Sequence, residues 1–125
     1  MKNPNKKIIC FDLDGVICTN TWGKYKSAKP ITGNINFINF LYKKNFKIII
    51  FTSRFMGRNK DNVMKANKSG YKFTEKQLHK WKLKYHKLIL GKPSYDILVD
   101  DKSIFFKKNW VKELKNQIDK EDNSF

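Results

Sequence analysis

Two aspartates, Asp12 and Asp14, follow the apolar run "KIICF" and stand two residues apart. This spacing predicts two carboxylates at the end of a buried strand, where the chain turns at Gly15. A lone Asp-x-Asp-Gly is often a calcium-binding or turn motif, so the rest of the chain decides its meaning. If the pair is catalytic, Asp12 could attack a phosphate ester in line. Asp14 could protonate the leaving oxygen and later deprotonate the attacking water.

Polar residues also follow three other apolar runs. They are Thr52, Ser53 and Arg54 at the end of residues 47–52, Lys92 after residues 87–90, and Asp100 and Asp101 after residues 95–99. Because ligands of parallel α/β sheets bind at the carboxyl ends of the strands, we expect these side chains to gather on one rim. Four strand ends in this order indicate a catalytic site more strongly than any single motif does.

A set of carboxylates gathered on one rim predicts a bound cation, because the carboxylates would otherwise repel one another. Oxygen ligands favour Mg²⁺, which also bridges to phosphate oxygens. The candidate metal ligands are Asp12, Asp14, Asp100 and Asp101. Lys92 by its charge and Thr52 by a hydrogen bond could hold the other phosphate oxygens. Metal and lysine together would neutralise the substrate enough for a carboxylate to approach phosphorus.

Further residues near this rim are candidates for substrate binding or selection. They are Gly15, Trp22, Tyr25, Lys26, Ser53, Arg54 and Arg58. Trp22 places a large ring in a loop, which indicates substrate stacking or a dimer contact. For Arg54 the alternative is a structural role at the edge of the sheet. His79 and His86 lack metal-ligand partners at zinc spacing, so we expect surface or packing roles for them.

Strands alternate with helices along the chain. The predicted strands are 7–11, 47–52, 87–90 and 95–99, and the predicted helices are 33–45, 59–69, 74–85 and 103–118. Gly70 is expected to stop the second helix, and Thr74 with Gln77 forms a capping box that starts the third. The strands are continuous apolar runs, which is typical of a parallel sheet covered on both faces.

The length of 125 residues predicts a single domain. Within it, residues 16–30 are predicted to form a flap with a small hairpin, and residues 1–6 and 119–125 to be loose ends. Only residues 15–51 separate the first acidic motif from Thr52, so no large lid fits between them. The site is therefore expected to be open, which is compatible with a homodimer in which a neighbouring subunit closes it.

The chain carries 27 Lys and Arg against 11 Asp and Glu, a formal net charge of +16. The lysines are scattered and form no basic run, so we favour composition over a nucleic-acid surface as the explanation. The charge still predicts attraction to anionic substrates that weakens as salt rises.

The two cysteines, Cys10 and Cys18, form neither a disulfide framework nor a CxxC metal motif, which favours a reducing cytoplasm. We expect Cys10 to be buried in its strand and Cys18 to be an ordinary loop residue. The longest apolar runs are too short to span a bilayer or to form a signal peptide, so no membrane partner is expected.

The sequence resembles the haloacid dehalogenase (HAD) superfamily, through "DLDGV", the strand ending in Thr52, Lys92 and the "DD" pair, over nearly the whole chain. The resemblance implies a capless α/β fold, a Rossmann-like three-layer sandwich with a central parallel sheet. It implies Asp12 as nucleophile, Asp14 as acid/base, and Mg²⁺ held by Asp12, the Asp14 carbonyl and one of the late aspartates. We favour Asp100 as that ligand, with Asp101 supporting it.

A finer likeness links "FDLDGVICT", "IFTSR", "GKPSYD" and "DDKS" to small HAD proteins of capsular or surface polysaccharide biosynthesis. It implies a phosphatase of a sugar, polyol or similarly small phosphorylated metabolite. Two alternatives remain open. One is a nucleotide or polynucleotide terminal phosphatase, and the other is a non-catalytic module that binds polyanions on a HAD scaffold.

Overall fold

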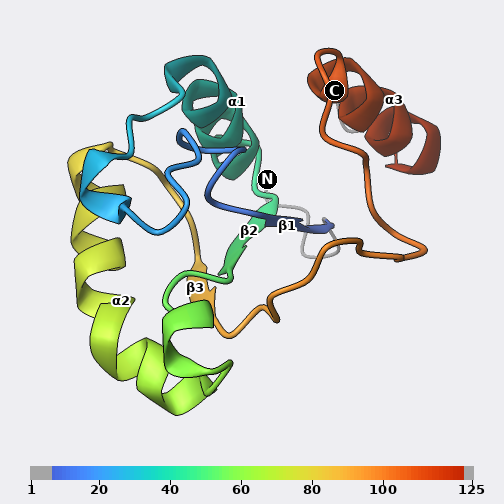
Figure 1. Ribbon diagram of the computed structural model, residues 1–125. Coiled ribbons are helices and arrows are strands. Elements are labelled where there is room, and N and C mark those ends of the chain that lie inside the picture. Colours follow the sequence, from blue (N-terminus) through green and yellow to red (C-terminus); the bar gives the residue numbers. More distant parts are fainter. Residues whose placement is uncertain (1–6, 123–125) are drawn as a thin grey trace. The chain divides into compact units, whose positions relative to one another are not determined.

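The computed structural model describes residues 7–122, which are divided between two compact units, Met1–Ser94 and Tyr95–Phe125 (Figure 1). The loose ends predicted at residues 1–6 and 123–125 lie outside the described residues. Residues 119–122 of the predicted loose tail belong to helix α3 (Trp110–Asp122). Across residues 7–122, no helix is both long and apolar enough to cross a membrane.

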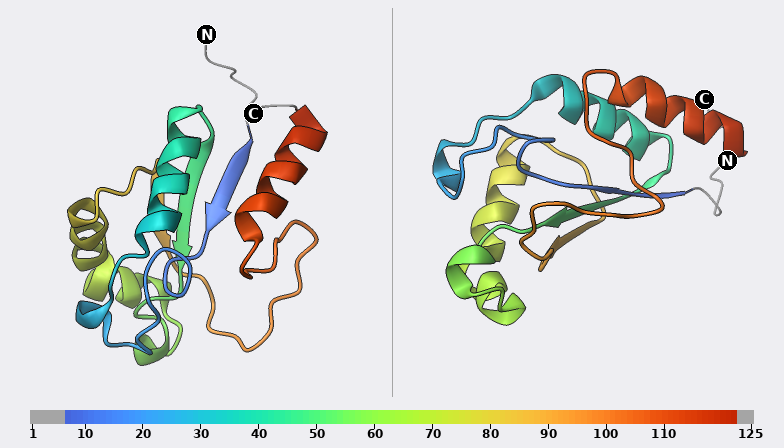
Figure 2. Two further views of the ribbon diagram at one scale, coloured as in Figure 1. Left: turned by 90° about the horizontal axis from the view of Figure 1, so that it is seen from above. Right: turned by 45° about the vertical axis from the view of Figure 1, so that its right-hand side comes forward.

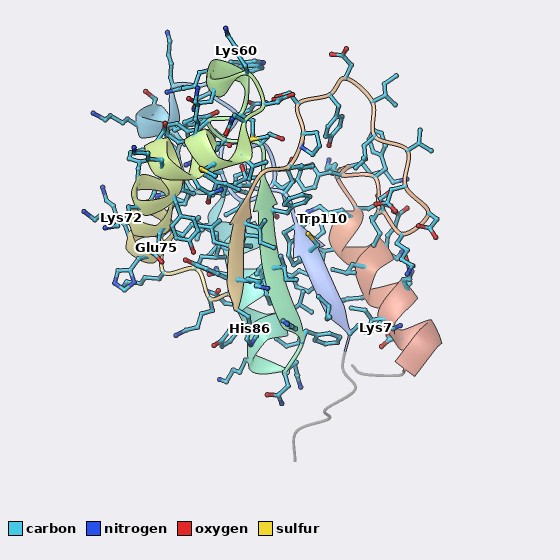
Figure 3. All side chains as sticks on the ribbon, turned by 90° about the horizontal axis from the view of Figure 1, so that it is seen from below. Lys7, Lys60, Lys72, Glu75, His86 and Trp110 are labelled. Atoms are coloured by element: carbon cyan, nitrogen blue, oxygen red, sulfur yellow. The ribbon has the colours of Figure 1, made fainter. Side chains whose placement is uncertain are left out.

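A parallel sheet forms the centre of the first unit and confirms three of the predicted strands. Its strands, in spatial order, are β1 (Ile8–Phe11), β2 (Lys47–Thr52) and β3 (Lys87–Leu90). Thr52 lies opposite Leu90 in the register, so the strands end together. Figure 3 shows His86 at the amino end of β3 and Lys60 beyond the carboxyl ends. The first unit is therefore an α/β unit, consistent with a Rossmann-like sandwich.

Helix α1 (Thr32–Lys43) follows the predicted amphipathic pattern and ends with a lysine, close to the predicted boundary. Ile35, Ile38 and Leu41, spaced by three residues, are its buried side chains. The helix contacts β2, over which it lies in the left view of Figure 2. Right-handed crossovers that advance in the same direction across a sheet place both connecting helices on one face, so α1 shares its face with α2 (Val63–Lys80).

Helix α2 runs unbroken through Gly70, so the two helices predicted at 59–69 and 74–85 are wrong. It starts at the N-cap Asn62, whose side chain accepts a hydrogen bond from the Lys65 amide at 3.0 Å. The capping box at Thr74 is also wrong, since Thr74 is buried inside the helix. The chain leaves the helix at Lys82, where φ is +60°.

The predicted strand at residues 95–99 is absent from the second unit. Ile97 and Val99 are 83% and 92% exposed there. An apolar, β-branched run has strand propensity, but a strand forms only when a partner completes its hydrogen bonds. The helix predicted at 103–118 begins only at Trp110, and Trp110, Leu114 and Ile118 are buried along one side of α3, whereas Phe105 is exposed.

The flap, residues 16–30, folds back on itself as the predicted small hairpin. Its two arms pair through a hydrogen bond from the Thr19 amide to the Lys29 carbonyl oxygen at 2.9 Å, and through a bridge between Cys18 and Pro30. At its tip lies a short 3-10 helix, η1 (Tyr25–Ser27). The flap therefore lies in the first unit, with the loop that carries the two aspartates.

Candidate active site

Asp12 and Lys92 meet at the carboxyl edge of the sheet, although 80 positions separate them in the chain. Asp12 directly follows β1 and Lys92 lies two residues after β3. The Lys92 Nζ atom is 3.5 Å from Asp12 Oδ2, and the other oxygen of Asp12 accepts a hydrogen bond from the Leu13 amide at 2.9 Å. The Asp12 side chain is still 40% exposed, so a ligand can reach it.

Burial raises the pKa of the Asp12 carboxyl above its ordinary value, because desolvation disfavours the charged form. The positive charge of Lys92 opposes this increase, as does the hydrogen bond from Leu13, while the negative charge of Asp14 adds to it. Lys92 thus helps to keep Asp12 ionised, which a nucleophilic carboxylate requires.

Thr52 ends β2, between the strands that carry Asp12 and Lys92. Its carbonyl oxygen accepts hydrogen bonds from the amides of Gly91 and Lys92, each at 3.2 Å, which fixes the start of the lysine loop. Its hydroxyl oxygen accepts a hydrogen bond from the Arg54 amide at 3.1 Å, so the hydroxyl proton remains for donation. Only 1% of Thr52 is exposed.

Asp14 lies in a tight turn that begins at Leu13 and closes at Cys18. Gly15 has φ of +91°, which favours glycine, and its amide donates to the Cys18 carbonyl oxygen at 2.8 Å. The Leu13 carbonyl oxygen accepts hydrogen bonds from several amides of the turn, including that of Ile17 at 2.8 Å. The turn therefore fixes the backbone of Asp14 relative to Asp12.

Arg54 binds the Asp14 carboxylate with both sides of its guanidinium group. Arg54 Nε donates to Asp14 Oδ2 at 2.8 Å and Nη2 donates to Oδ1 at 2.9 Å. Arg54 is only 1% exposed, whereas lysine and arginine normally stay at the surface. Such a bidentate pair fixes the orientation of a carboxylate as well as its position.

Other contacts of Arg54 connect it to helix α2 and to the flap. Its Nη1 donates to Gln77 Oε1 at 2.6 Å, and its guanidinium carbon lies 4.6 Å from the centre of the Tyr25 ring. Gln77 Nε2 in turn donates to the Tyr25 carbonyl oxygen at 2.8 Å. The Tyr25 hydroxyl accepts a hydrogen bond from the Phe55 amide at 3.2 Å.

A cavity of about 470 Å³ opens beside the flap. The residues that line it include Tyr25, Lys26, Phe55, Arg58 and Phe73. It thus includes three aromatic rings and two of the cationic residues that the sequence suggested for substrate selection. Trp22 is not among its lining residues and is 85% exposed.

Ser53 and Asp100, the first of the aspartate pair after residues 95–99, make hydrogen bonds within their own units. The Ser53 hydroxyl donates to the Pro93 carbonyl oxygen at 3.1 Å. Asp100 and Asp101 belong to the second unit and are exposed. Asp100 Oδ1 accepts a hydrogen bond from the Lys102 amide at 2.9 Å, which makes a turn of residues 100–103. In neither unit do three Asp, Glu, His or Cys side chains of the described residues form a metal-binding group.

The predictions for the two cysteines are wrong in both cases. Cys10 is exposed, because successive side chains of β1 point to opposite faces of the sheet and Cys10 lies on the face opposite to that of the buried Phe11, whereas Cys18 is fully buried in the turn. Burial and the charge of Asp14 raise the pKa of the Cys18 thiol to about 12. His86 has the expected packing role: its ring stacks on Tyr42, and its Nδ1 accepts a hydrogen bond from the Ile48 amide.

Three residues of this site were missed in the sequence. Gln77 stood out only as a capping-box partner, and Phe55 and Phe73 did not stand out at all. In α2, the buried positions Ala66, Gly70, Thr74 and Leu78 recur every four residues, and Gln77 lies beside this stripe. A polar side chain next to a buried helical stripe was therefore the one available indication for Gln77.

Comparisons with known proteins give information about the fold of this chain and not about its chemistry. No protein-family model and no curated protein matches the chain. Its fold is similar to that of an MCSG target protein from Vibrio cholerae, known from a crystal structure, with a TM-score of 0.75 and 24% sequence identity. The match covers 93% of this chain and 98% of the other. At this identity, the chemistry must be argued from the site.

Proposed function

We propose that this protein is a Mg²⁺-dependent phosphatase that hydrolyses a small phosphate monoester through an aspartyl-phosphate, as a capless member of the HAD superfamily. The observation that carries the proposal is the approach of Lys92 Nζ to Asp12 Oδ2, 3.5 Å apart at the carboxyl edge of the sheet. An ammonium beside an accessible carboxylate can attract a phosphate group and screen its negative charge from the nucleophile. The chain between β1 and β2 holds only the flap and α1, which supports the capless type.

The proposed reaction uses Asp12 as the nucleophile and Asp14 first as the acid and then as the base. Asp12 attacks phosphorus, and the bond between phosphorus and the leaving oxygen breaks. Asp14 gives its proton to that oxygen, then takes a proton from the water that attacks the aspartyl-phosphate. Phosphate leaves and Asp12 is restored. Lys92 and the Thr52 hydroxyl would hold the phosphate oxygens that do not react.

The oxygen atoms after β1 fit a magnesium ion in chemical type. The Asp12 carboxylate is partly exposed, and within residues 7–122 no hydrogen bond engages the main-chain carbonyl oxygen of Asp14. Both are hard oxygen donors. These two groups, with Asp100 or Asp101, are the ones that we propose to hold the ion. When bound, Mg²⁺ would neutralise negative charge on the phosphate.

For the substrate we propose a phosphorylated sugar, polyol or similar small metabolite, in capsular or surface polysaccharide biosynthesis. The cavity of about 470 Å³ lined by Tyr25, Lys26 and Arg58 supports a small substrate and a role for the flap in selecting it. The free thiols of Cys10 and Cys18 support a reducing cytoplasm. The exposed ring of Trp22 supports a homodimer.

A nucleotide or polynucleotide terminal phosphatase is the second candidate. The cavity supports it, because Tyr25, Phe55 and Phe73 offer rings for base stacking beside cationic side chains. Faster release of phosphate from a phosphorylated oligonucleotide or a nucleotide than from any sugar or polyol phosphate would select this candidate.

The test is turnover of p-nitrophenyl phosphate, followed by a panel of sugar, polyol and nucleotide monophosphates. We expect turnover with Mg²⁺, none with EDTA, and none in Asp12→Asn. Lys92→Met should also lose most of its activity, whereas Lys80→Met, which removes an exposed lysine at the end of α2, should keep it. Turnover that needs no metal, or full activity in Asp12→Asn, would overturn the proposal.

A further inference from the structure

Gln77 occupies a position between the flap and the buried ion pair of Arg54 with Asp14. Its carboxamide oxygen accepts from Arg54 Nη1 at 2.6 Å, and its nitrogen donates to the Tyr25 carbonyl oxygen at 2.8 Å. Gln77 therefore connects helix α2 to both the ion pair and the flap.

We propose that Gln77 and Arg54 are positioning residues, which hold the Asp14 carboxylate in the orientation that proton transfer to the leaving oxygen requires. The inference rests on the proposed phosphatase function and assigns roles that the sequence did not predict. Arg54, expected to bind substrate, would act on Asp14 instead.

The hydrogen bonds of Arg54 argue for this role. Nε and Nη2 bind the two oxygens of Asp14, Nη2 also lies 3.6 Å from Cys18 Sγ, and Nη1 binds Gln77. Four of the five N–H groups of a guanidinium are thus engaged. With the side chain fully buried, Arg54 reaches the chemistry through Asp14.

Gln77 suits its place because a carboxamide offers an acceptor and a donor at the same end. Arginine needs the acceptor and the Tyr25 carbonyl needs the donor. Glutamate would keep the acceptor and lose the donor, and methionine would keep the length and lose both. These two replacements therefore separate the bond to Arg54 from the bond to the flap.

The reaction offers a measurement that a merely structural role would not change. A poor leaving group, such as the alcohol of glycerol phosphate, needs a proton as its bond to phosphorus breaks, whereas p-nitrophenolate leaves without one. If Asp14 is misplaced, kcat/KM, which covers the steps up to release of the leaving group, should fall for the alkyl phosphate and change little for the aryl phosphate. The turnover number kcat should fall for both, because Asp14 also activates the water that releases phosphate. A general loss of folded protein would lower kcat/KM equally for both substrates.

The experiment measures kcat and KM for glycerol phosphate and p-nitrophenyl phosphate in wild type, Gln77→Met, Gln77→Glu and the control Gln117→Met. Gln117 is an exposed glutamine of α3. In Gln77→Met we expect kcat/KM for the alkyl phosphate to fall roughly 10-fold or more, and kcat/KM for the aryl phosphate less than about 3-fold.

Gln77→Glu, which keeps the bond to Arg54, should restore the wild-type ratio of kcat/KM for glycerol phosphate to kcat/KM for p-nitrophenyl phosphate. Gln117→Met should retain this ratio. Should Gln77→Met fail to fold, Gln77→Asn, which is too short to reach both partners, should show the same selective loss. Equal losses of kcat/KM on both substrates, or no loss on the alkyl phosphate, overturn the inference and leave the proposed function standing. A wild-type protein that releases no phosphate from either substrate overturns the proposed function and the inference with it.

Discussion

Arg54 and Asp14 form a bidentate ion pair in which the arginine side chain is fully buried and 18% of the aspartate side chain is exposed. Removal of one partner of a buried pair leaves an uncompensated charge in a poorly solvated place. We therefore expect Arg54→Met to lower the free energy of unfolding by about 3–5 kcal/mol. Urea denaturation followed by circular dichroism measures this change.

Arg58→Met is the matched control for that variant, since Arg58 is exposed and contacts the Tyr25 and Phe55 rings. Its loss should cost about 1 kcal/mol or less. Asp14→Asn should restore part of the stability of Arg54→Met, because it removes the unpaired charge. Equal costs for Arg54→Met and Arg58→Met would show that the buried pair does not stabilise the fold.

Gly70 gives a second prediction, because a Cβ atom at this position would overlap the ring of Phe55. Alanine normally stabilises the interior of a helix by about 1 kcal/mol relative to glycine. Here we expect Gly70→Ala to destabilise the protein by about 1–3 kcal/mol instead, since the ring and the flap contacts must shift. The thermal midpoint measures the sign of the effect.

Gly33→Ala in α1 is the control, since nothing lies within 4 Å of a Cβ atom there. It should stabilise the protein slightly, by about 0.4–1 kcal/mol. The double variant Gly70→Ala with Phe55→Ala should lose less stability than the sum of the two single changes. A gain in stability from Gly70→Ala alone would contradict the packing of Phe55 on this helix.

The two thiols should differ in their reaction with Ellman's reagent. The thiolate is the reactive form, and a pKa of about 12 leaves almost none of it on Cys18 between pH 7 and 9. Partial desolvation raises the pKa of the Cys10 thiol as well, but the residue is exposed enough for the reagent to reach it, so its labelling should become faster as the pH rises.

Native protein should thus react at one thiol, and unfolded protein at two. Cys10→Ser should remove the native reaction, and Cys18→Ser should leave it unchanged. Labelling of both thiols at similar rates in folded protein would contradict the burial of the turn that carries Asp14.

Some of the fold and of the site could be predicted from the sequence because they depend on local patterns. Three apolar runs gave three parallel strands, and the residues at their ends include the pair of Asp12 with Lys92. Strand direction alone brings the residues after β1 and β3 to one edge, so this proximity needed no knowledge of side-chain packing.

Other features depend on packing, which local patterns do not reveal. Gly70 looked like a helix stop, yet it lies inside α2. Only glycine fits there without a shift, because the Phe55 ring occupies the space that a Cβ atom would fill. The apolar residues 95–99 looked like a strand, but pairing is a property of the partner as well as of the segment. Arginine side chains usually lie at the surface, but that of Arg54 is buried. Its ion pair with Asp14 therefore could not be predicted from the sequence.

The most direct test of the account is to trap the phosphate group on the protein. Wild-type protein is mixed with substrate and Mg²⁺, quenched in acid and reduced with borohydride, which converts an aspartyl-phosphate to homoserine. We predict homoserine at position 12 by peptide mass spectrometry, and none in Asp12→Asn or when EDTA replaces the metal. Phosphate release without any such mark at Asp12, or a mark at another aspartate, would contradict the assignment of Asp12 as the nucleophile.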